Sequence, residues 1–326
     1  MTADLKKLRI VFMGTPDFAV ASLDALVKAG CHIVAVITAP DKAGGRGLKL
    51  QQSAIKKYAD ENKLKVLQPE KLKNPDFLEE LKLLKADLQI VVAFRMLPEV
   101  VWNMPPMGTL NLHGSLLPQY RGAAPINWAI INGEKETGVT IFKLKQEIDT
   151  GDILSQAIIP IGENETAGEL HDRMKVIGAS LLVNTVKRLT EGTIMEVPQE
   201  KTQEAILNIQ DSNSEPDSRL LKPAPKIHTD TCRINWSQPV EVVFNLVRGL
   251  SPYPAAFIIL NEKMLKIFKA QKEVIFPTLP EGEYETDGKT FLKFACTNGY
   301  LHLLEVQLEG KKKMTIEEFL RGYRFG

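Results

Sequence analysis

Residues 8–40 read LRIVFMGTPDFAVASLDALVKAGCHIVAVITAP, a strand–helix–strand pattern. Two short apolar runs flank a stretch in which Phe18, Leu23 and Leu26 share one helical face, and Gly30 follows that stretch as a stop signal. Parallel strands need a crossover connection of this length, usually a helix. The segment therefore predicts the first unit of a parallel sheet covered by helices.

The same alternation continues to about residue 192. Further helices are expected at 53–63, 74–86 and 166–192, and further strands at 88–94, 109–113, 138–144 and 152–161. Asn74 is expected to cap the second of these helices. The third carries a capping box, and its expected buried side comprises Leu170, Met174, Ile177, Leu181 and Leu189. The last two strands have little between them, which allows an antiparallel edge. The pattern favours an α/β fold with a doubly wound, mostly parallel, Rossmann-like sheet.

The character of the chain changes after residue 192. Residues 193–225 lose periodicity and are rich in Ser, Asn, Asp and Pro, which is typical of a linker. Residues 226–326 contain short strand-like runs separated by Gly turns, which predicts a small OB-like β-barrel. We therefore expect a catalytic domain at 1–192, a linker at 193–225 and a barrel domain at 226–326.

Composition limits the class of protein. The 326 residues are 44% hydrophobic and 25% charged, with a net charge of +1, so a nucleic acid would have to be attracted by local patches. The sequence has no apolar run long enough to cross a bilayer and no apparent signal peptide. Its three cysteines are far apart, which predicts neither a disulfide framework nor a zinc site. A cytoplasmic protein with reduced thiols, making no membrane contact, is the simplest interpretation.

The run NLHGSLLPQYRGAAP at residues 111–125 combines polar and helix-breaking residues at the end of an expected strand. Ligands of open α/β sheets bind outside the carboxyl ends of the strands. Asn111 and His113 are two residues apart, so they project to the same side while the strand persists. Together they could donate two hydrogen bonds to one developing oxyanion. A lone histidine is more often structural, but this position favours a catalytic role.

A carboxylate is expected beside this pair. Asp149 and Asp152 flank Thr150-Gly151 at another strand junction, and the residues alone leave open which of the two approaches His113, or whether the segment is only a turn. An Asn–His pair with a carboxylate suits acyl transfer to an amine. The sequence shows no metal-ligand spacing nearby, so no metal is expected.

Two glycine-containing segments have competing interpretations. FMGTPDFA at 12–19 has one glycine where a dinucleotide fingerprint has three, so a tight strand-to-helix turn is favoured over a nicotinamide cofactor site. PDKAGGRGLKLQQS at 40–53 carries Lys42, Arg46 and Lys49 among three glycines. This loop is suited to binding phosphates, and a solvated surface loop is an equal alternative.

The run from Asn111 to Pro118, the following YRGAAP and the segment NGEKETGVTIFKLKQEIDTGDIL resemble the signature of formyl-tetrahydrofolate-dependent formyltransferases. The segments GTPDFA, PDKAGGRGLKL, RINWSQP, LSPYPAAF and GKKKMTIEEFLRGYRF extend the resemblance over nearly the whole chain. The resemblance implies that a monomer transfers the formyl group of 10-formyltetrahydrofolate to the α-amino group of methionyl initiator tRNA in translation initiation. It also implies direct attack by the amine, without a metal.

The resemblance also assigns residue roles. It places the catalytic trio at Asn111, His113 and Asp149. It implies folate contacts along the following residues: Phe94, Arg95, Met96, Leu97, Ser115, Leu116, Leu117 and Pro118. The basic loop with Lys42, Arg46 and Lys49, together with the barrel, is expected to contact tRNA.

Four other functions are compatible with parts of the sequence. A sugar-nucleotide N-formyltransferase or a formyltetrahydrofolate hydrolase domain would carry the same signature, but neither needs the basic loop. A non-catalytic folate-binding protein would not need an intact Asn111, His113 and Asp149. A nicotinamide-dependent oxidoreductase is disfavoured by the single Gly14.

Overall fold

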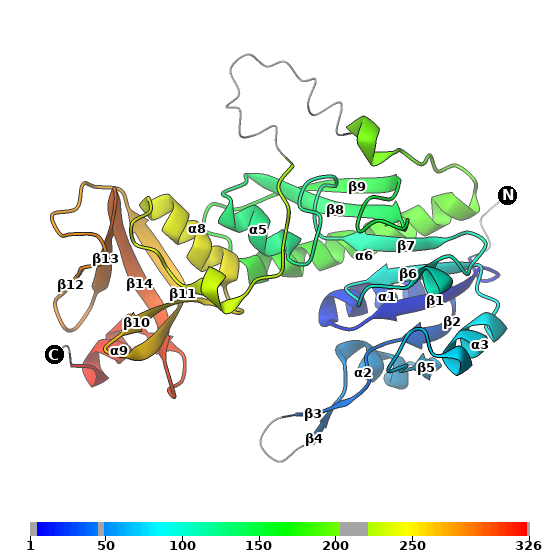
Figure 1. Cartoon of the computed structure of the whole chain (residues 1–326), viewed down its shortest axis with the longest axis horizontal. Helices are drawn as coiled ribbons and strands as arrows, with labels where there is room; N and C mark the ends of the chain where they lie inside the picture. The colour runs from blue at the N-terminus through cyan, green and yellow to red at the C-terminus, as the bar shows by residue number, and fades with distance from the viewer. Residues whose placement is uncertain (1–4, 45–48, 203–220, 325–326) are drawn as a thin grey trace. The chain divides into compact units, whose positions relative to one another are not determined.

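The computed structural model describes residues 5–44, 49–202 and 221–324 (Figure 1). The chain divides into two compact units. Unit 1 comprises 1–121, 138–159 and 172–223, and unit 2 comprises 122–137, 160–171 and 224–326. Each unit therefore consists of three segments that alternate along the chain. The domain boundaries expected from the sequence stay predictions. No helix of the described residues is long and apolar enough to cross a membrane.

A seven-stranded sheet organises unit 1, with the strand order β5-β2-β1-β6-β7-β8-β9 (Figure 1). The strands are β1 (Arg9–Gly14), β2 (His32–Ile37), β5 (Val66–Leu67), β6 (Leu88–Val92), β7 (Thr109–His113), β8 (Glu136–Lys143) and β9 (Ile153–Pro160). Every pair from β5 to β7 is parallel, and β8 pairs with β7 antiparallel. The doubly wound, mostly parallel sheet and its antiparallel edge are confirmed.

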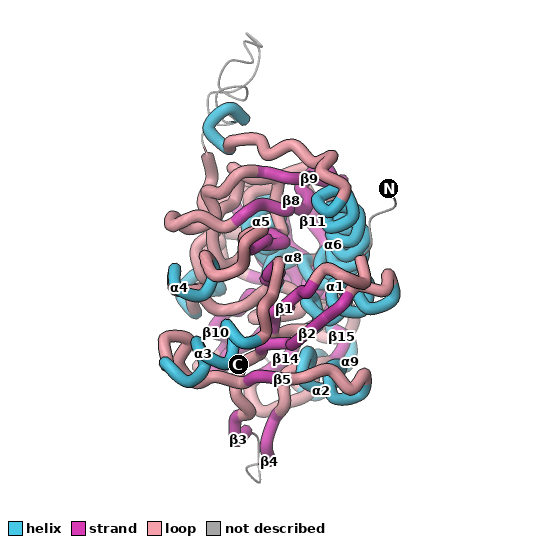
Figure 2. The backbone as a smooth tube through the Cα atoms, turned by 90° about the vertical axis from the view of Figure 1, so that its right-hand side faces the viewer, coloured by secondary structure: helices cyan, strands magenta, loops and turns pink. Residues whose placement is uncertain are grey.

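Helices cover both faces of this sheet. They are α1 (Asp17–Lys28), α2 (Ala54–Glu61), α3 (Pro75–Leu83), α4 (Glu99–Trp102) and α6 (Ala167–Thr190). Figure 2 shows α1 and α6 on one side of the strands and α3 and α4 on the other. Val11 and Met13 of β1 pack in a core cluster with Phe77 of α3 and Val101 of α4. Alternate β1 residues face the opposite side of the sheet, as strand geometry requires.

Side-chain caps fix two of the helix starts as predicted. The Asn74 side chain accepts a hydrogen bond from the Asp76 backbone amide at 2.8 Å. At the start of α6 the Thr166 amide donates to the Glu169 carboxylate at 2.8 Å, while the Glu169 amide donates to the Thr166 hydroxyl at 3.3 Å. This reciprocal pair satisfies amides that the helix itself leaves unbonded.

The buried face of α6 matches the expected one in the first half of the helix and differs from it in the second half. Leu170 and Met174 are fully buried as predicted. Beyond them Leu182 and Val186 are fully buried, whereas the predicted Ile177, Leu181 and Leu189 are only half-buried. From about residue 177 onward the covered stripe is therefore shifted by about one residue. Helical side chains lean toward the N-terminus, so the spot that a residue covers does not lie directly above its Cα.

The glycine-rich basic segment forms a hairpin where the sequence predicted a loop. Strand β3 (Lys42–Gly44) pairs antiparallel with β4 (Lys49–Gln51), and the hairpin projects beyond the β5 edge of the sheet (Figures 1 and 2). At its base the Asp41 carboxylate accepts hydrogen bonds from Lys56 and Gln68. These two bonds hold the pKa of Asp41 below its ordinary value. The base of the hairpin is thereby tied to the body of unit 1.

Unit 2 contains the β-rich C-terminal part. Its elements are α5 (Pro125–Ile131), a 3-10 turn (Thr229–Cys232), α8 (Val240–Leu250), β10 (Ala256–Leu260), β11 (Lys263–Glu273), β12 (Tyr284–Thr286), β13 (Leu292–Cys296), β14 (Gly299–Leu308), β15 (Met314–Thr315) and α9 (Ile316–Gly322). The antiparallel strand path is β10-β11-β14-β13-β12, with β15 beside β14. Helices α8 and α9 contribute to the same apolar core as these strands. The expected barrel is a curled half-barrel.

The three cysteines are buried and free, as their number and separation predicted. Burial raises the pKa of the Cys296 thiol to about 12. A buried thiol that stays protonated behaves as a small apolar side chain. The cysteines therefore contribute to packing.

Candidate active site

Strand β7 delivers both residues of the expected oxyanion pair. Asn111 is half-buried on this strand, and His113, its last residue, is 8% exposed. Their antiparallel partners on β8 are Phe142 and Thr140. The Phe142 ring meets the imidazole edge-on, with 6.5 Å between ring centroids. Asn111 and His113 thus lie on one strand at the carboxyl end of the sheet.

One hydrogen bond orients the His113 imidazole. Its Nε2 lies 2.9 Å from the backbone carbonyl oxygen of Tyr120, which only accepts, so Nε2 donates. In the neutral ring Nδ1 is therefore the acceptor. The ring is held by the loop that follows β7.

The side-chain amide of Asn111 has no hydrogen-bond partner within residues 5–44, 49–202 and 221–324. A half-buried amide next to an oriented imidazole can donate to a ligand oxygen at little reorganisation cost. Asn111 and His113 are therefore suited to the oxyanion role predicted from their spacing.

Residues 114–121 form a wall that hydrogen bonds hold in place. The Ser115 hydroxyl donates to the Gln119 carbonyl at 2.6 Å, and the Thr140 hydroxyl donates to the Ser115 carbonyl at 2.6 Å. The Gln156 amide donates to the Leu117 carbonyl at 2.9 Å. Ser115 and Leu117 are both buried, so their side chains stabilise the loop from within.

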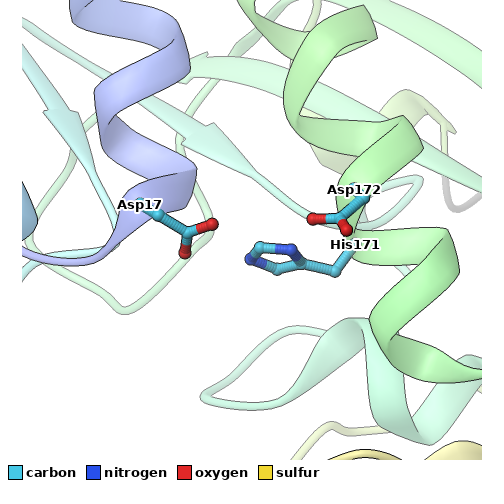
Figure 3. Close-up of side chains that lie close together, drawn as sticks. All are labelled: Asp17, His171 and Asp172. Carbon is cyan, nitrogen blue, oxygen red and sulfur yellow. The ribbon is translucent and has the colours of Figure 1, made fainter.

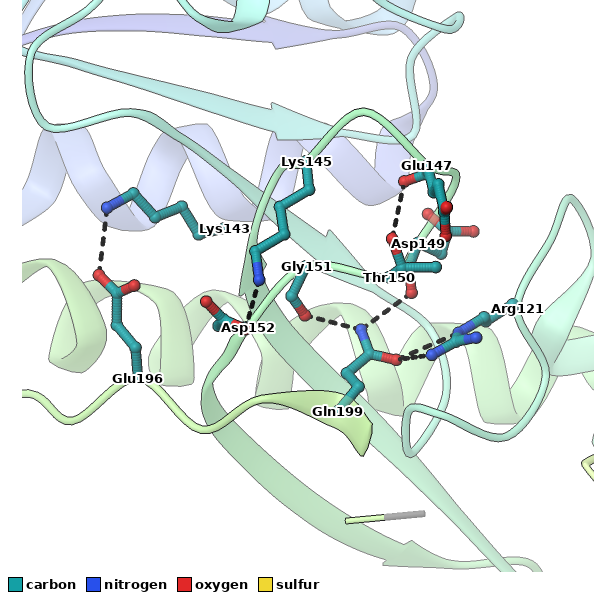
Figure 4. A network of polar contacts seen from close by, with 10 residues as sticks. All are labelled: Arg121, Lys143, Lys145, Glu147, Asp149, Thr150, Gly151, Asp152, Glu196 and Gln199. Atoms are coloured by element: carbon teal, nitrogen blue, oxygen red, sulfur yellow. Dashed lines mark hydrogen bonds and ion pairs between the residues drawn. The ribbon is translucent and has the colours of Figure 1, made fainter. Parts of the chain in front are cut away.

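Asp149 lies in the loop between β8 and β9, with a left-handed φ of 54°. The Thr150 hydroxyl donates to the Glu147 carbonyl at 3.2 Å within this loop (Figure 4). A Cβ on Gly151 would lie 1.6 Å from the Lys143 carbonyl oxygen, so only glycine fits there. Gly151 therefore does more than form a turn. Because it has no side chain, the backbone just before β9 can lie against the end of β8.

Two polar residues that the sequence did not single out hold the Asp149 loop. The Gln199 amide nitrogen donates to the Asp149 and Gly151 carbonyl oxygens at 2.9 and 2.8 Å (Figure 4). The Gln199 amide oxygen accepts from Arg121 Nε and Nη2 at 3.1 and 2.6 Å. Gln199 lies in the expected linker, where the spacing of apolar residues does not indicate a buried position. The pairing of His113 with Asp149 stays a prediction.

Three loops at this end of unit 1 each contain a non-glycine residue with positive φ. Ala93 has φ 48° after β6, Tyr120 has φ 59° after β7, and Asp149 has φ 54° after β8. Left-handed backbone is unfavourable for such residues and is concentrated at functional sites. Of the eight such residues that the structure describes, these three lie in the loops that carry candidate site residues.

The segment from Phe94 to Leu97 follows β6 and borders an open groove. The Arg95 guanidinium lies 5.5 Å from the centre of the Phe94 ring and donates to the Glu70 carbonyl at 2.7 Å. Burial lowers the pKa of Arg95. Met96 is 73% exposed, and Leu97 is buried. The groove has a volume of about 1100 Å³ and is lined by residues that include Leu72, Lys73, Met96 and Val100.

Of the three basic residues expected at the tRNA, two lie in the described hairpin. Lys42 is the first residue of β3 and is exposed, and Lys49 is the first residue of β4. Arg46 lies outside the described residues. The hairpin places Lys42 and Lys49 on neighbouring strands.

Asp17, His171 and Asp172 are potential metal ligands (Figure 3). However, Lys175 Nζ lies 2.6 Å from the Asp172 carboxylate and 3.3 Å from that of Asp17. An ammonium ion thus already compensates both carboxylates. The independence from metals expected for the reaction stays a prediction.

Comparison with known families agrees with this geometry. Residues 8–186 match the formyl transferase family, and residues 226–324 match its C-terminal domain. The chain therefore belongs to the formyl transferase family. A methionyl-tRNA formyltransferase of Bacteroides fragilis is 51% identical over 97% of this chain and 95% of its own. A methionyl-tRNA formyltransferase of Parabacteroides distasonis is 53% identical over 97% of this chain and 96% of its own. Within the family, the chain is an enzyme of the methionyl-tRNA formyltransferase group.

Solved structures share the fold. An N-formyltransferase from Helicobacter canadensis, in complex with folinic acid and dTDP-3-aminofucose, gives a TM-score of 0.65 at 22% identity, covering 94% of this chain and all of its own. HypX from Aquifex aeolicus, in complex with tetrahydrofolic acid, gives a TM-score of 0.60 at 20% identity, covering 96% of this chain and 47% of its own. At these identities the likeness shows the fold alone.

Proposed function

We propose that this enzyme transfers the formyl group of 10-formyltetrahydrofolate to the α-amino group of methionyl initiator tRNA, the step that prepares this tRNA for translation initiation. The observation that carries the proposal is the Asn111 side-chain amide, which has no partner among the described residues, on the same strand as the oriented His113 imidazole. The chain is also about half identical to enzymes of that name. The catalytic residues would be Asn111, His113 and Asp149.

The reaction is a direct transfer between two nitrogens. The α-amine attacks the formyl carbon, a C–N bond forms, and the formyl oxygen becomes an oxyanion. Asn111 donates one hydrogen bond to that oxygen. His113 donates a second from Nδ1 in its charged form, since Nε2 is bonded to the Tyr120 carbonyl. Collapse of the intermediate breaks the bond from the formyl carbon to the folate nitrogen.

Asp149 would stabilise the positive charge on His113 and accept the proton that the amine loses. A carboxylate beside His113 favours the imidazolium form, which is the form that can donate twice. The proton lost by the amine goes to the Asp149 carboxylate, and the folate nitrogen takes up this proton from Asp149 as it leaves. Fixed donors and dipoles of this kind contribute most when they are oriented before the reaction.

The folate would lie along the loops after β6 and β7. Met96 and Leu97 border the groove, and Arg95 and Phe94 stack at its edge. Because Ser115 and Leu117 are buried, contact there would come from the backbone and from the half-buried Leu116. Pro118 would shape the same wall.

The tRNA would contact Lys42 and Lys49 of the hairpin, Arg46 between them in the sequence, and the C-terminal domain at 226–326. Lysine and arginine side chains neutralise phosphates and give binding that weakens with salt. A monomeric state and a cytoplasmic location are part of the same proposal.

A sugar-nucleotide N-formyltransferase is the second candidate, because enzymes of that kind share the fold. We expect Arg46→Ala to reduce formylation of methionyl-tRNA mainly by weakening tRNA binding, because arginine bridges phosphate oxygens or stacks on bases. The apparent tRNA affinity of the wild type should fall with added salt, and the variant should show a smaller salt slope. Formylation rates measured across a salt series provide the test.

Lys82→Ala is the matched control, since it removes one positive charge from an exposed position on α3. It should behave as the wild type at every salt concentration. Wild-type kinetics of Arg46→Ala throughout the series would remove the hairpin from tRNA recognition and favour a small amine substrate.

A further inference from the structure

Gln199 is a fully buried polar side chain in a segment whose described residues contribute no strand to the seven-stranded sheet. A two-residue antiparallel bridge anchors this segment: the Ile153 amide donates to the Val197 carbonyl at 2.8 Å, and the Val197 amide donates back at 2.9 Å. A buried amide is stable only when its hydrogen bonds are satisfied. The partners of Gln199 therefore indicate its role.

All the partners of Gln199 lie in two loops of the candidate active site (Figure 4). Its amide nitrogen uses both hydrogens, one on the Asp149 carbonyl at 2.9 Å and one on the Gly151 carbonyl at 2.8 Å. This double donation holds the backbone on both sides of Thr150. It fixes the left-handed φ of 54° at Asp149, a conformation that the residue does not favour by itself.

The other end of the Gln199 amide reaches the loop after β7. Its oxygen accepts from Arg121 Nε at 3.1 Å and Nη2 at 2.6 Å. Arg121 follows Tyr120, whose carbonyl oxygen accepts the hydrogen bond from His113 Nε2. One buried amide thus joins the loop that carries Asp149 to the loop that orients His113.

We propose that Gln199 is a positioning residue, which sets the Asp149 carboxylate relative to His113 through the two backbone carbonyls and Arg121. The inference rests on the proposed role of Asp149. Arg121 orients the Gln199 side chain. Two N–H groups of its guanidinium donate to the Gln199 amide oxygen, so the amide nitrogen at the other side must face the Asp149 loop. The chemistry requires an amide, because only an amide donates from one end and accepts at the other.

Gln199→Glu tests this requirement with almost no change in shape. A carboxylate keeps the bond to Arg121, and indeed strengthens it, but places an oxygen against two carbonyl oxygens. We expect the melting temperature to change by a few degrees and both KM values to stay within about twofold. We expect kcat to fall by about 10- to 100-fold, the scale of a displacement of about 1 Å at a catalytic group.

Hydrogen exchange supplies a structural readout of the same variant. Backbone amides in residues 147–152 should exchange faster than in the wild type, while those of β6 should be unchanged. The neighbouring Glu200→Gln is the matched control, because it makes the reverse exchange of carboxylate and amide at an exposed position. It should leave kcat and hydrogen exchange unchanged.

Arg121→Gln decides the question if Gln199→Glu does not fold. It removes the force that orients the amide, and should lower kcat by about three- to tenfold at unchanged KM. A wild-type kcat in Gln199→Glu, or in Arg121→Gln where the first variant does not fold, would overturn the proposal. Asp149→Asn is measured in parallel: if it is as active as the wild type, the assigned role of Asp149 fails. If only Asp149→Asn is impaired, the inference about Gln199 fails alone.

Discussion

Replacing His113 by alanine is expected to lower kcat for formyl transfer by about a hundredfold or more, the scale of losing one oxyanion donor. The residue is 8% exposed at the end of β7, and its Nε2 donates to the Tyr120 carbonyl at 2.9 Å, so alanine removes a donor that is oriented before the reaction. Asn111→Ala should have a similar effect. Steady-state kinetics with both substrates saturating measure the loss, and folate affinity should change little.

His32→Ala is the control, because His32 is an exposed histidine at the start of β2. It should keep the wild-type kcat. If His113→Ala and Asn111→Ala also turned over at close to the wild-type rate under saturating substrates, the oxyanion role assigned to this pair would be wrong.

Gly151→Ala is expected to have the second large effect. The added methyl group would lie 1.6 Å from the Lys143 carbonyl oxygen and 3.1 Å from the Phe142 ring, so the backbone of the Asp149 loop has to move. A displacement of about 1 Å at a catalytic group can lower the rate by about a hundredfold. We expect a loss of kcat of that order, together with a lower melting temperature.

Gly322→Ala shows whether the loss at Gly151 is specific. A Cβ at Gly322 has no neighbour within 4 Å, so this variant should match the wild type in melting temperature and kcat. Full activity in Gly151→Ala would mean that the loop tolerates displacement, and hence that the position of Asp149 is not critical.

The sheet and its helices could be predicted because local patterns determine them. Apolar runs of strand length and a 3.6-residue period are visible in the sequence, and Asn74 and Thr166 mark helix starts through their own side chains. The positions of Asn111 and His113 at a strand end could be predicted for the same reason. The residue types there, in a loop rich in glycine and proline, are unusual for a packed strand.

Other features depend on contacts between distant segments and left no local signal. Gln199 bonds to carbonyl oxygens 48 and 50 residues away, and backbone carbonyls are present at every position, whatever the residue. The sequence favours a loop at the β3–β4 hairpin because the glycines of this segment weaken strand propensity. The buried face of α6 matches the expected one at Leu170 and Met174 and is shifted by about one residue beyond them, since the spacing of apolar residues specifies a face only approximately.

The identity of the acceptor amine is the central claim, and a competition assay tests it most directly. The enzyme is given limiting 10-formyltetrahydrofolate with equal concentrations of methionyl initiator tRNA and a dTDP-amino sugar, and both products are quantified by mass spectrometry. We predict that nearly all of the formyl group appears on the methionine α-amine, and that Asn111→Ala and His113→Ala each greatly reduce that product. Formylation of the sugar in preference to the tRNA would contradict the account.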